Sequence, residues 1–165
     1  MSNKKKRNIS GTEVKIRRAG MSDMADLYKW RNHPDVRMNS FNSDDISWEK
    51  HKEWFERVKK DPAYTIYIAY YGKDKIGSIR FDDKTDVTKV SVMLSPDFWG
   101  MGLGADVIRL GTARFIRGKK PAKKIVAEIK KDNVASVKSF KKAGFREGHT
   151  TYVLDLNEGV IWEKQ

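Results

Sequence analysis

The sequence predicts a single domain of the mixed α/β (α+β) class, with a central sheet of about six to seven strands and helices on both faces. Period-two patterns over 64–71, 75–81 and 88–94 are separated by short turns, which is typical of antiparallel neighbours. The strand–helix–strand order across 88–129 requires a parallel pair joined by a right-handed crossover. At 165 residues the chain is long enough to bury one core.

The first half of the chain predicts one strand followed by two helices. Residues 13–18 alternate as a short strand does. Ser22 is expected to cap the first helix, which ends before Pro34 because the residue preceding a proline leaves the α region. A loop leads to Ser47, the expected cap of a second helix that carries His51 on its apolar face. We expect His51 to be a buried core histidine.

The second half predicts two more helices and further strands. A helix over 103–115 follows the third alternating segment, and a strand over 124–129 comes next. Asn133 is expected to cap a helix that ends at Gly144. The residues from Phe145 onward are interpreted as a closing strand or hairpin.

Charge and composition narrow the class of protein. We expect one domain over 13–157, between a basic N-terminal tail, 1–12, and a C-terminal tail, 158–165. The net charge of +12 suits nucleic acid, an anionic membrane surface or a polyanionic small molecule as partner. No nucleic-acid motif accompanies this charge, so nucleic acid is not the expected partner.

The residue types exclude several kinds of site. The sequence has no cysteine, which excludes disulfides, thiolate metal ligands and a cysteine nucleophile. No apolar run approaches the roughly 20 residues of a membrane span, and the N-terminus lacks the apolar core of a signal peptide. We therefore expect a cytoplasmic protein with no membrane partner and no metal, and the sequence leaves a homodimer open.

The segment from Trp99 to Ala105 is the main indication of function. It places three alternating glycines at the start of a helix, shortly after an apolar strand. Glycines leave backbone N–H groups uncovered, and the helix dipole adds positive charge, so the segment predicts a cradle for phosphate. Gly100-x-Gly102-x-x-Ala105 also satisfies the dinucleotide pattern. In that fold, however, the strand leads almost directly into the first glycine, whereas here residues 95–99 lie between them. A nucleoside-triphosphate loop is excluded because G-x-x-x-x-G-K-[ST] is absent. The alternative to a phosphate cradle is that the glycines merely permit a turn.

Together with a second segment, this cradle resembles the acetyl-CoA motifs of the GNAT superfamily of N-acetyltransferases. The family signature is [QR]-x-x-G-x-[GA] after an apolar-x-Pro turn, which here falls at 94–96 with Gly102 and Gly104. Trp99 stands at the Gln/Arg position, a departure from the signature. The next family motif is N-x-x-[AS] followed by an aromatic residue and Gly-Phe, which here lies between Asn133 and Phe145. The resemblance covers about residues 13–157.

The resemblance implies a single GNAT-like domain in which strands 88–94 and 124–129 splay apart. Acetyl-CoA is the expected cosubstrate, with its pantetheine arm in the wedge and its pyrophosphate in the cradle. The residues expected to bind it are Val92, Met93, Leu94, Trp99, Gly100, Met101, Gly102, Leu103, Gly104, Ala105, Asn133, Ser136 and Phe140.

The resemblance also suggests catalytic groups. Many relatives place a tyrosine acid where Phe140 stands, and phenylalanine cannot donate a proton. Ser136 resembles a serine of ribosomal-protein N-terminal acetyltransferases and is the candidate donor to the departing thiolate. Glu128, in a mostly apolar strand, is either the general base or half of a buried ion pair. His33 is a weaker candidate base, and the Leu94 N–H is the candidate oxyanion donor.

The acceptor is expected to bind to the first half of the chain. The segment 30–37, followed by 46–54, is similar to acetyltransferases that act on nucleotide-linked amino-deoxysugars, as in pseudaminic-acid synthesis. Arginines suit a sugar-nucleotide because a planar guanidinium binds a diphosphate bidentately. The expected substrate-binding residues are Arg31, Asn32, His33 and Arg37. An N-terminal-peptide acceptor, a polyamine acceptor and a basic nucleic-acid module without catalysis are the alternatives.

Overall fold

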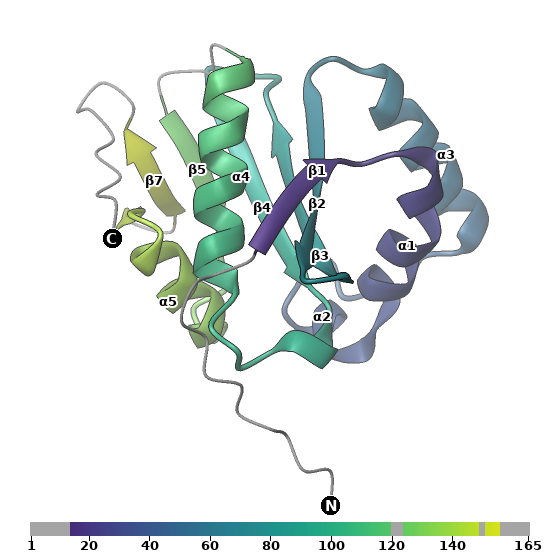
Figure 1. Ribbon diagram of the computed structural model, residues 1–165, viewed down its shortest axis with the longest axis horizontal. Helices are drawn as coiled ribbons and strands as arrows, with labels where there is room; N and C mark the ends of the chain where they lie inside the picture. The colour runs from purple at the N-terminus through teal and green to yellow at the C-terminus, as the bar shows by residue number, and fades with distance from the viewer. Residues whose placement is uncertain (1–13, 120–123, 149–150, 156–165) are drawn as a thin grey trace, which may run out of the picture.

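The computed structural model describes residues 14–119, 124–148 and 151–155 (Figure 1). Its strands are β1 Val14–Arg18, β2 Tyr64–Tyr71, β3 Asp74–Asp82, β4 Val87–Leu94, β5 Lys124–Glu128, β6 Arg146–Glu147 and β7 Thr151–Asp155. Its helices are α1 Met24–Asn32, α2 Pro34–Met38, α3 Trp48–Lys60, α4 Gly104–Gly118 and α5 Val134–Lys142, with 3₁₀ turns at Met21–Asp23 (η1) and Pro96–Phe98 (η2). The predicted tails, 1–12 and 158–165, lie outside the described residues.

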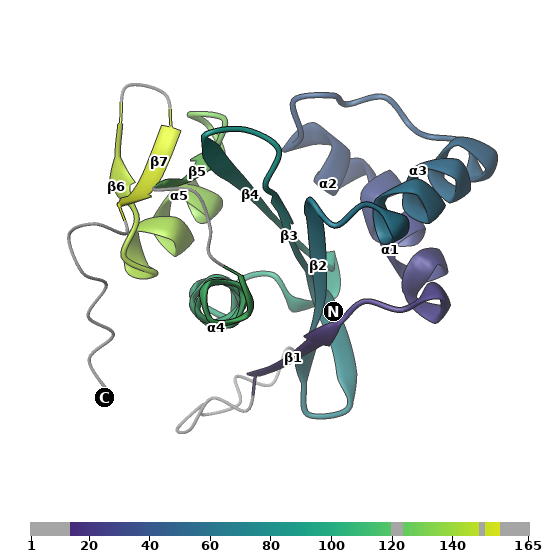
Figure 2. The same ribbon diagram turned by 90° about the horizontal axis from the view of Figure 1, so that it is seen from above.

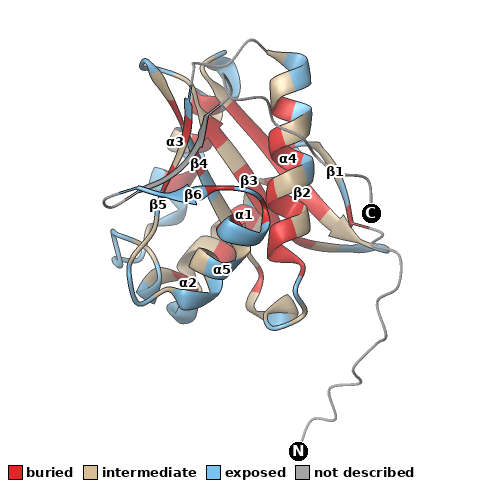
Figure 3. Cartoon of the chain, turned by 90° about the vertical axis from the view of Figure 1, so that its left-hand side faces the viewer, coloured by how far each residue is buried: buried red, intermediate tan, exposed pale blue. Residues whose placement is uncertain are grey.

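The strands form one mixed sheet in the order β1-β2-β3-β4-β5-β7-β6. β4 and β5 run parallel, and the other neighbouring strands run antiparallel. Helices α1 and α3 cover one face, while α4 and α5 cover the other (Figure 2). Each face has its own hydrophobic cluster, one of which contains Phe55 and the other Phe115. Buried residues follow the central strands and the inner side of α4 (Figure 3). The predicted mixed sheet with helices on both faces is confirmed.

The parallel pair separates after a short stretch. β4 and β5 pair at Val87↔Lys124, Thr88↔Ile125 and Lys89↔Val126, whereas β4 stays paired with β3 as far as Leu94. Beyond Lys89, the side of β4 that faces β5 therefore has no partner among the described strands. The expected splayed pair is confirmed, and it creates an opening in the middle of the sheet.

The prediction that Ser22 caps the first helix is wrong. The chain turns through η1 before α1 begins, and the buried residue at this junction is Asp23. Its carboxylate accepts a hydrogen bond from the Gly20 N–H at 2.7 Å and two from Arg17 at 2.7 and 2.8 Å. Lys75 Nζ lies 2.8 Å from the same carboxylate. Sequence periodicity misses this arrangement because an aspartate between apolar positions is usually exposed.

The segment after α1, predicted as a loop, contains the short helix α2. Pro34 starts this helix, where the missing N–H costs no hydrogen bond. The ring Nδ1 of His33 accepts a hydrogen bond from the Asp35 N–H at 3.3 Å. The predicted caps Ser47 and Asn133 are confirmed, since each side chain accepts a hydrogen bond from the N–H three residues later.

We expect Asp23→Asn to lower the free energy of unfolding by about 3–5 kcal/mol, because Arg17 and Lys75 lose a buried partner. Burial by itself would raise the pKa of Asp23, but hydrogen bonds from Arg17, Lys75 and Gly20 outweigh it and hold that pKa below its usual range. The stabilisation is therefore present above about pH 4 and is lost as the pH falls further.

Urea unfolding at about pH 7 and about pH 3 measures this effect, and the variant should lose less stability on acidification than the wild type. Asp26→Asn is the control, because Asp26 contacts Lys75 from a side chain that is 40% exposed. This control should cost less than about 1 kcal/mol. Equal losses in the two variants would contradict the role given to Asp23.

Candidate functional site

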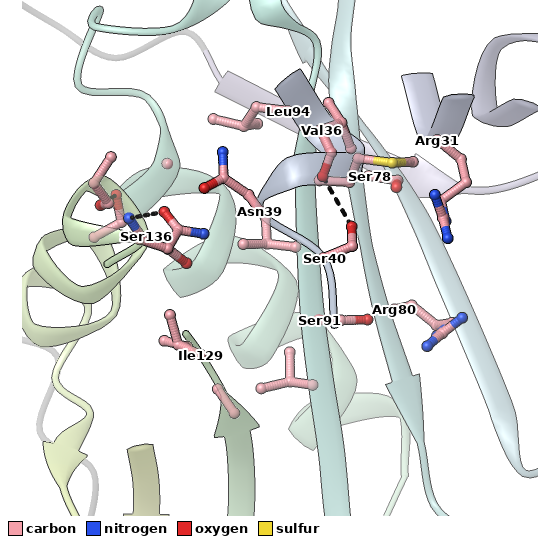
Figure 4. A pocket seen from close by; sticks show the side chains of 18 of the residues that line it. Arg31, Val36, Asn39, Ser40, Ser78, Arg80, Ser91, Leu94, Ile129 and Ser136 are labelled. Atoms are coloured by element: carbon pink, nitrogen blue, oxygen red, sulfur yellow. Dashed lines mark hydrogen bonds between the residues drawn. The ribbon is translucent and has the colours of Figure 1, made fainter. Parts of the chain in front are cut away.

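A cleft of about 770 Å³ opens where β4 leaves β5 (Figure 4). One half is lined by the end of β4, the glycine segment after it, the end of β5 and the first turns of α5. The other half is lined by α1, α3, the loop after α2 and the facing side of β2 and β3. We call these the cofactor half and the acceptor half. The two halves come from different parts of the sequence, as the predictions required.

Backbone groups of β4 form one wall of the cofactor half. The Ser95 N–H donates to the Ile76 carbonyl at 2.8 Å, and the β3–β4 register continues unbroken from Leu94 back to Lys89. Backbone groups alternate sides along a strand, so those of Val92 and Leu94 point away from β3 and into the gap. An extended ligand can add to this edge as a strand would.

The glycine segment leads from η2 into α4. Gly100 and Gly102 both have φ of 74°, which L side chains rarely adopt, and a Cβ at either would meet nothing within 4 Å. α4 starts at Gly104, and no side chain caps its first turn. The first N–H groups of the helix therefore stay available at its positive end. Open space, free backbone donors and a helix N-terminus together fit an anionic group such as a pyrophosphate.

The departure at Trp99 has a structural role. Its indole Nε1 donates to the Leu94 carbonyl at 3.0 Å, which ties the glycine segment to the end of β4. The same bond occupies the Leu94 carbonyl, so the N–H is the group that Leu94 leaves facing the gap. Trp99 thus fixes the geometry of the cradle, although its side chain carries no charge for a phosphate.

Helix α5 brings Ser136 and Phe140 to the cofactor half. The Asn133 Oδ1 accepts a hydrogen bond from the Ser136 N–H at 3.2 Å, which starts the helix at the edge of the cleft (Figure 4). Phe140 is 1% exposed and packs edge-on against Phe145, with ring centroids 5.0 Å apart. It gives the cleft an apolar wall, and Ser136 gives it a hydroxyl.

Glu128 lines the cleft, but it is exposed rather than buried. Its side chain is 48% exposed, and Oε1 lies 2.9 Å from Lys89 Nζ. This pair joins β4 to β5 where the two strands begin to separate. The ion pair considered for Glu128 is therefore present, with Lys89 as partner, but it is exposed rather than buried because β5 ends at this residue and solvent reaches the gap.

Two arginines line the acceptor half, of which Arg31 was predicted and Arg80 was not. Arg31 Nη2 donates to the Asn42 carbonyl at 2.8 Å, whereas Nη1 is buried and has no hydrogen-bond partner in the described part of the chain. The guanidinium carbon of Arg80 lies 5.6 Å from the centre of the Trp54 ring. Burial lowers the pKa of both arginines, because the charged form is poorly hydrated there.

The strand pattern contained a signal for Arg80. Positions 78, 80 and 91 are polar and alternate with apolar residues on the opposite face of the sheet. The register places Arg80 beside Ser91, so the polar side chains form one patch on a face that helices cover. Polar residues on the inner side of two adjacent strands indicate a site rather than a core.

Five predicted site residues lie outside the cleft lining: Asn32, His33, Arg37, Met101 and Ala105. The Asn32 side chain exchanges two hydrogen bonds, of 2.8 and 2.9 Å, with the backbone of the loop before α3. His33 caps α2, and Arg37 Nη1 lies 3.9 Å from a carboxylate of the same loop. Met101 packs against the core, and Ala105 is buried in α4. All the other predicted site residues line the cleft.

His51 is a core histidine, as predicted. It is 2% exposed, and its Nε2 lies 2.9 Å from the Met24 carbonyl. A carbonyl only accepts hydrogen bonds, so we assign the proton to Nε2. Burial lowers the pKa of His51, which favours the neutral ring. In the described part of the chain, no three His, Asp or Glu side chains gather as metal ligands, and no helix has the length and apolarity to cross a membrane.

The fold, the open β4 edge and the glycine cradle are those of an acetyltransferase domain of the GNAT type. The sequence matches the acetyltransferase (GNAT) domain family over residues 13–146, and the chain belongs to that family. It is 23% identical over 140 residues to an uncharacterised protein of Methanocaldococcus jannaschii. This match covers 82% of the chain but 28% of the relative, so the chain spans less than a third of that protein.

Solved structures share the fold. A domain from Methanocaldococcus jannaschii has a TM-score of 0.74 at 21% identity, covering 88% of this chain and 100% of that one. An aminoglycoside acetyltransferase in complex with coenzyme A has a TM-score of 0.75 at 20% identity, covering 88% and 96%. The spermidine N-acetyltransferase from Vibrio cholerae, in complex with CoA and spermine, has a TM-score of 0.73 at 16% identity. This match covers 86% of this chain and 92% of that one. At these identities the likeness concerns the fold alone.

We expect Gly102→Ala to weaken acetyl-CoA binding by about tenfold, or about 1.4 kcal/mol, because the loop must leave its left-handed conformation or hold it under strain. Gly72→Ala is a matched control: Gly72 has φ of 60° with nothing near its Cβ position, but it lies in the β2–β3 turn, outside the cleft lining. Calorimetric titration measures both affinities.

Both alanine variants should lose about 1–2 kcal/mol of stability, and acetyl-CoA affinity should fall in Gly102→Ala alone. Equal affinities in the two variants would argue against the cradle. Gly104 is unsuitable for this test, because its Cβ would lie 2.7 Å from Ser139 Oγ and would displace α5.

Proposed function

We propose that the protein transfers the acetyl group of acetyl-CoA to a primary amine on a nucleotide-linked amino-deoxysugar. The observation that carries this proposal is the charge of the acceptor half. Arg31 and Arg80 line it, and among the described residues Glu128 is the one carboxylate that lines any part of the cleft. Guanidinium groups bind phosphate oxygens bidentately, so this half suits an anionic acceptor better than a polycation.

The cofactor half supports acetyl-CoA as the donor, which supplies a thioester carbonyl for attack by the amine. Backbone N–H groups at Gly100, Gly102 and the start of α4 would hold the pyrophosphate. The free edge at Val92 and Leu94 would hold the pantetheine arm like an added strand.

Three residues of this chain are proposed for the chemical step. The Leu94 N–H, which faces the gap, would stabilise the oxyanion of the tetrahedral intermediate. Ser136 would donate a hydrogen bond to the departing thiolate, directly or through water, since Phe140 has no proton to give. Glu128 would take the amine proton through water, because its carboxylate is open to solvent at the cleft.

The structural relatives support a small amine acceptor without choosing among them. One similar structure is an aminoglycoside acetyltransferase, and another is a spermidine N-acetyltransferase bound to spermine. Amines of such different structure occur within one fold, so the acceptor must be inferred from the side chains of this cleft. A polyamine would require carboxylates where the cleft presents Arg31 and Arg80.

We expect Ser136→Ala to lower kcat by about 10- to 100-fold at all pH values, with the KM for acetyl-CoA changed by less than about threefold. Glu128→Gln should lower kcat by about tenfold, since it removes the proposed general base. Steady-state release of the coenzyme A thiol measures both. An unchanged kcat in Glu128→Gln would assign the base elsewhere.

The first experiment is calorimetric titration with acetyl-CoA, with NAD and ATP as controls. Acetyl-CoA should bind with a Kd of about 1–100 μM, and the controls should not bind measurably. The acceptor test then compares a nucleotide-linked amino sugar, spermidine and a peptide with a free N-terminus.

We expect kcat/KM for the nucleotide-linked amine to exceed that for spermidine by at least about 100-fold, or about 2.7 kcal/mol. Faster turnover of spermidine or of the peptide would replace the proposed acceptor. Absence of acetyl-CoA binding would overturn the donor as well.

A further inference from the structure

The floor of the acceptor half carries a polar patch built from two neighbouring strands. Ser78 and Arg80 come from β3 and Ser91 from β4, and the register places Arg80 directly beside Ser91. Ile66 and Met93, which lie on the same face, pack in the hydrophobic cluster around Phe55. The patch therefore consists of one cation and two hydroxyls on an otherwise apolar surface.

Arg80 has no counter-ion within the described part of the chain. No carboxylate there lies within 4.0 Å of its guanidinium, which instead lies over the face of the Trp54 ring. Asp82 lies two residues further along β3 and does not line the cleft. It raises the pKa of Arg80 by charge interaction but forms no ion pair with it. A charge in a poorly hydrated place without a partner costs stability, and a bound anion would remove that cost.

Arg31 contributes a second unpaired group from the opposite wall. It comes from α1 rather than from the sheet, and no described residue accepts a hydrogen bond from its buried Nη1. In Figure 4 the guanidinium groups of Arg31 and Arg80 both lie on the side of the cleft away from Ser136. The unpaired donors of the acceptor half thus gather away from the proposed site of acetyl transfer.

We infer that Arg80, Arg31, Ser78 and Ser91 form a subsite that binds the diphosphate of the acceptor. The inference rests on the proposed function and deepens it, because it assigns the charged part of the acceptor to a place remote from the reacting amine. A single arginine can bind both oxygens of one carboxylate. Two arginines on two walls, together with two hydroxyls, offer more donors than one carboxylate accepts, and they match two linked phosphates.

The test is a calorimetric titration of UDP, and separately of inorganic pyrophosphate, into protein saturated with coenzyme A. Coenzyme A fills the cradle at α4, so binding of a diphosphate then reports a second site. We expect both probes to bind the wild type, and Arg80→Gln to weaken UDP binding at least tenfold, about 1.4 kcal/mol. Arg80→Lys should weaken it about threefold, because a point charge replaces the planar fork.

Arg114→Gln is the matched control. The Arg114 guanidinium also lies over an aromatic ring, 5.8 Å from the centre of Tyr67, but Arg114 does not line the cleft. This variant should bind UDP as the wild type does, and all variants should keep their affinity for coenzyme A within about twofold.

Three results would overturn the subsite: unchanged UDP binding in Arg80→Gln, equal weakening in Arg114→Gln, or coenzyme A binding by a wild type that binds neither diphosphate. Each of them leaves the proposed donor intact. Failure of the wild type to bind coenzyme A is a different outcome, which overturns the proposed function and the subsite with it.

Discussion

The separation of β4 from β5 is the constraint on which the rest of the site depends. Three residue pairs hold the two strands together. Beyond them β4 stays paired with β3 but is no longer paired with β5. A strand edge inside a sheet leaves N–H and C=O groups that need partners, because unpaired backbone groups are costly wherever water is excluded. The cleft places these groups where a ligand can satisfy them. The cradle, the wall of α5 and the acceptor half are all arranged around this one gap.

The wall of the cofactor half is held by close packing. Gly104 sits so near Ser139 that a Cβ would lie 2.7 Å from its Oγ, which brings the start of α4 against α5. The Trp99 indole ties the same segment to the end of β4. The free N–H groups of α4 and the hydroxyl of Ser136 are therefore fixed relative to one another before any ligand arrives. Donors held in place in this way lose little freedom when they bind, which favours both affinity and catalysis.

The acceptor half is built from the other side of the sheet and is held by polar contacts. Asn32 fixes the loop before α3 through two hydrogen bonds, and Lys130 reaches across to the Met38 carbonyl at 3.0 Å. Asp23 joins β1, β3 and the entry to α1 through Arg17 and Lys75. These contacts satisfy the polar groups that carry them, whereas Arg80 and Nη1 of Arg31 find no acceptor among the described residues. Unpaired cations beside a well-paired framework are the reason to expect an anionic acceptor.

The sequence by itself determined the mixed sheet, the caps at Ser47 and Asn133 and the glycine cradle at Gly100–Gly104. Each of these depends on local properties: strand alternation, a side chain bonded to its own helix, and backbone angles open mainly to glycine. The tertiary structure decided that Asp23 is buried, that Asn32 serves a loop, that Glu128 is exposed and that Arg80 lines the acceptor half. For these residues the environment is set mainly by segments distant in the sequence, and their own spacing contains little information about it. Burial and charge compensation belong to the packed molecule, so only the folded chain could show which polar residues were paired and which were left for a ligand.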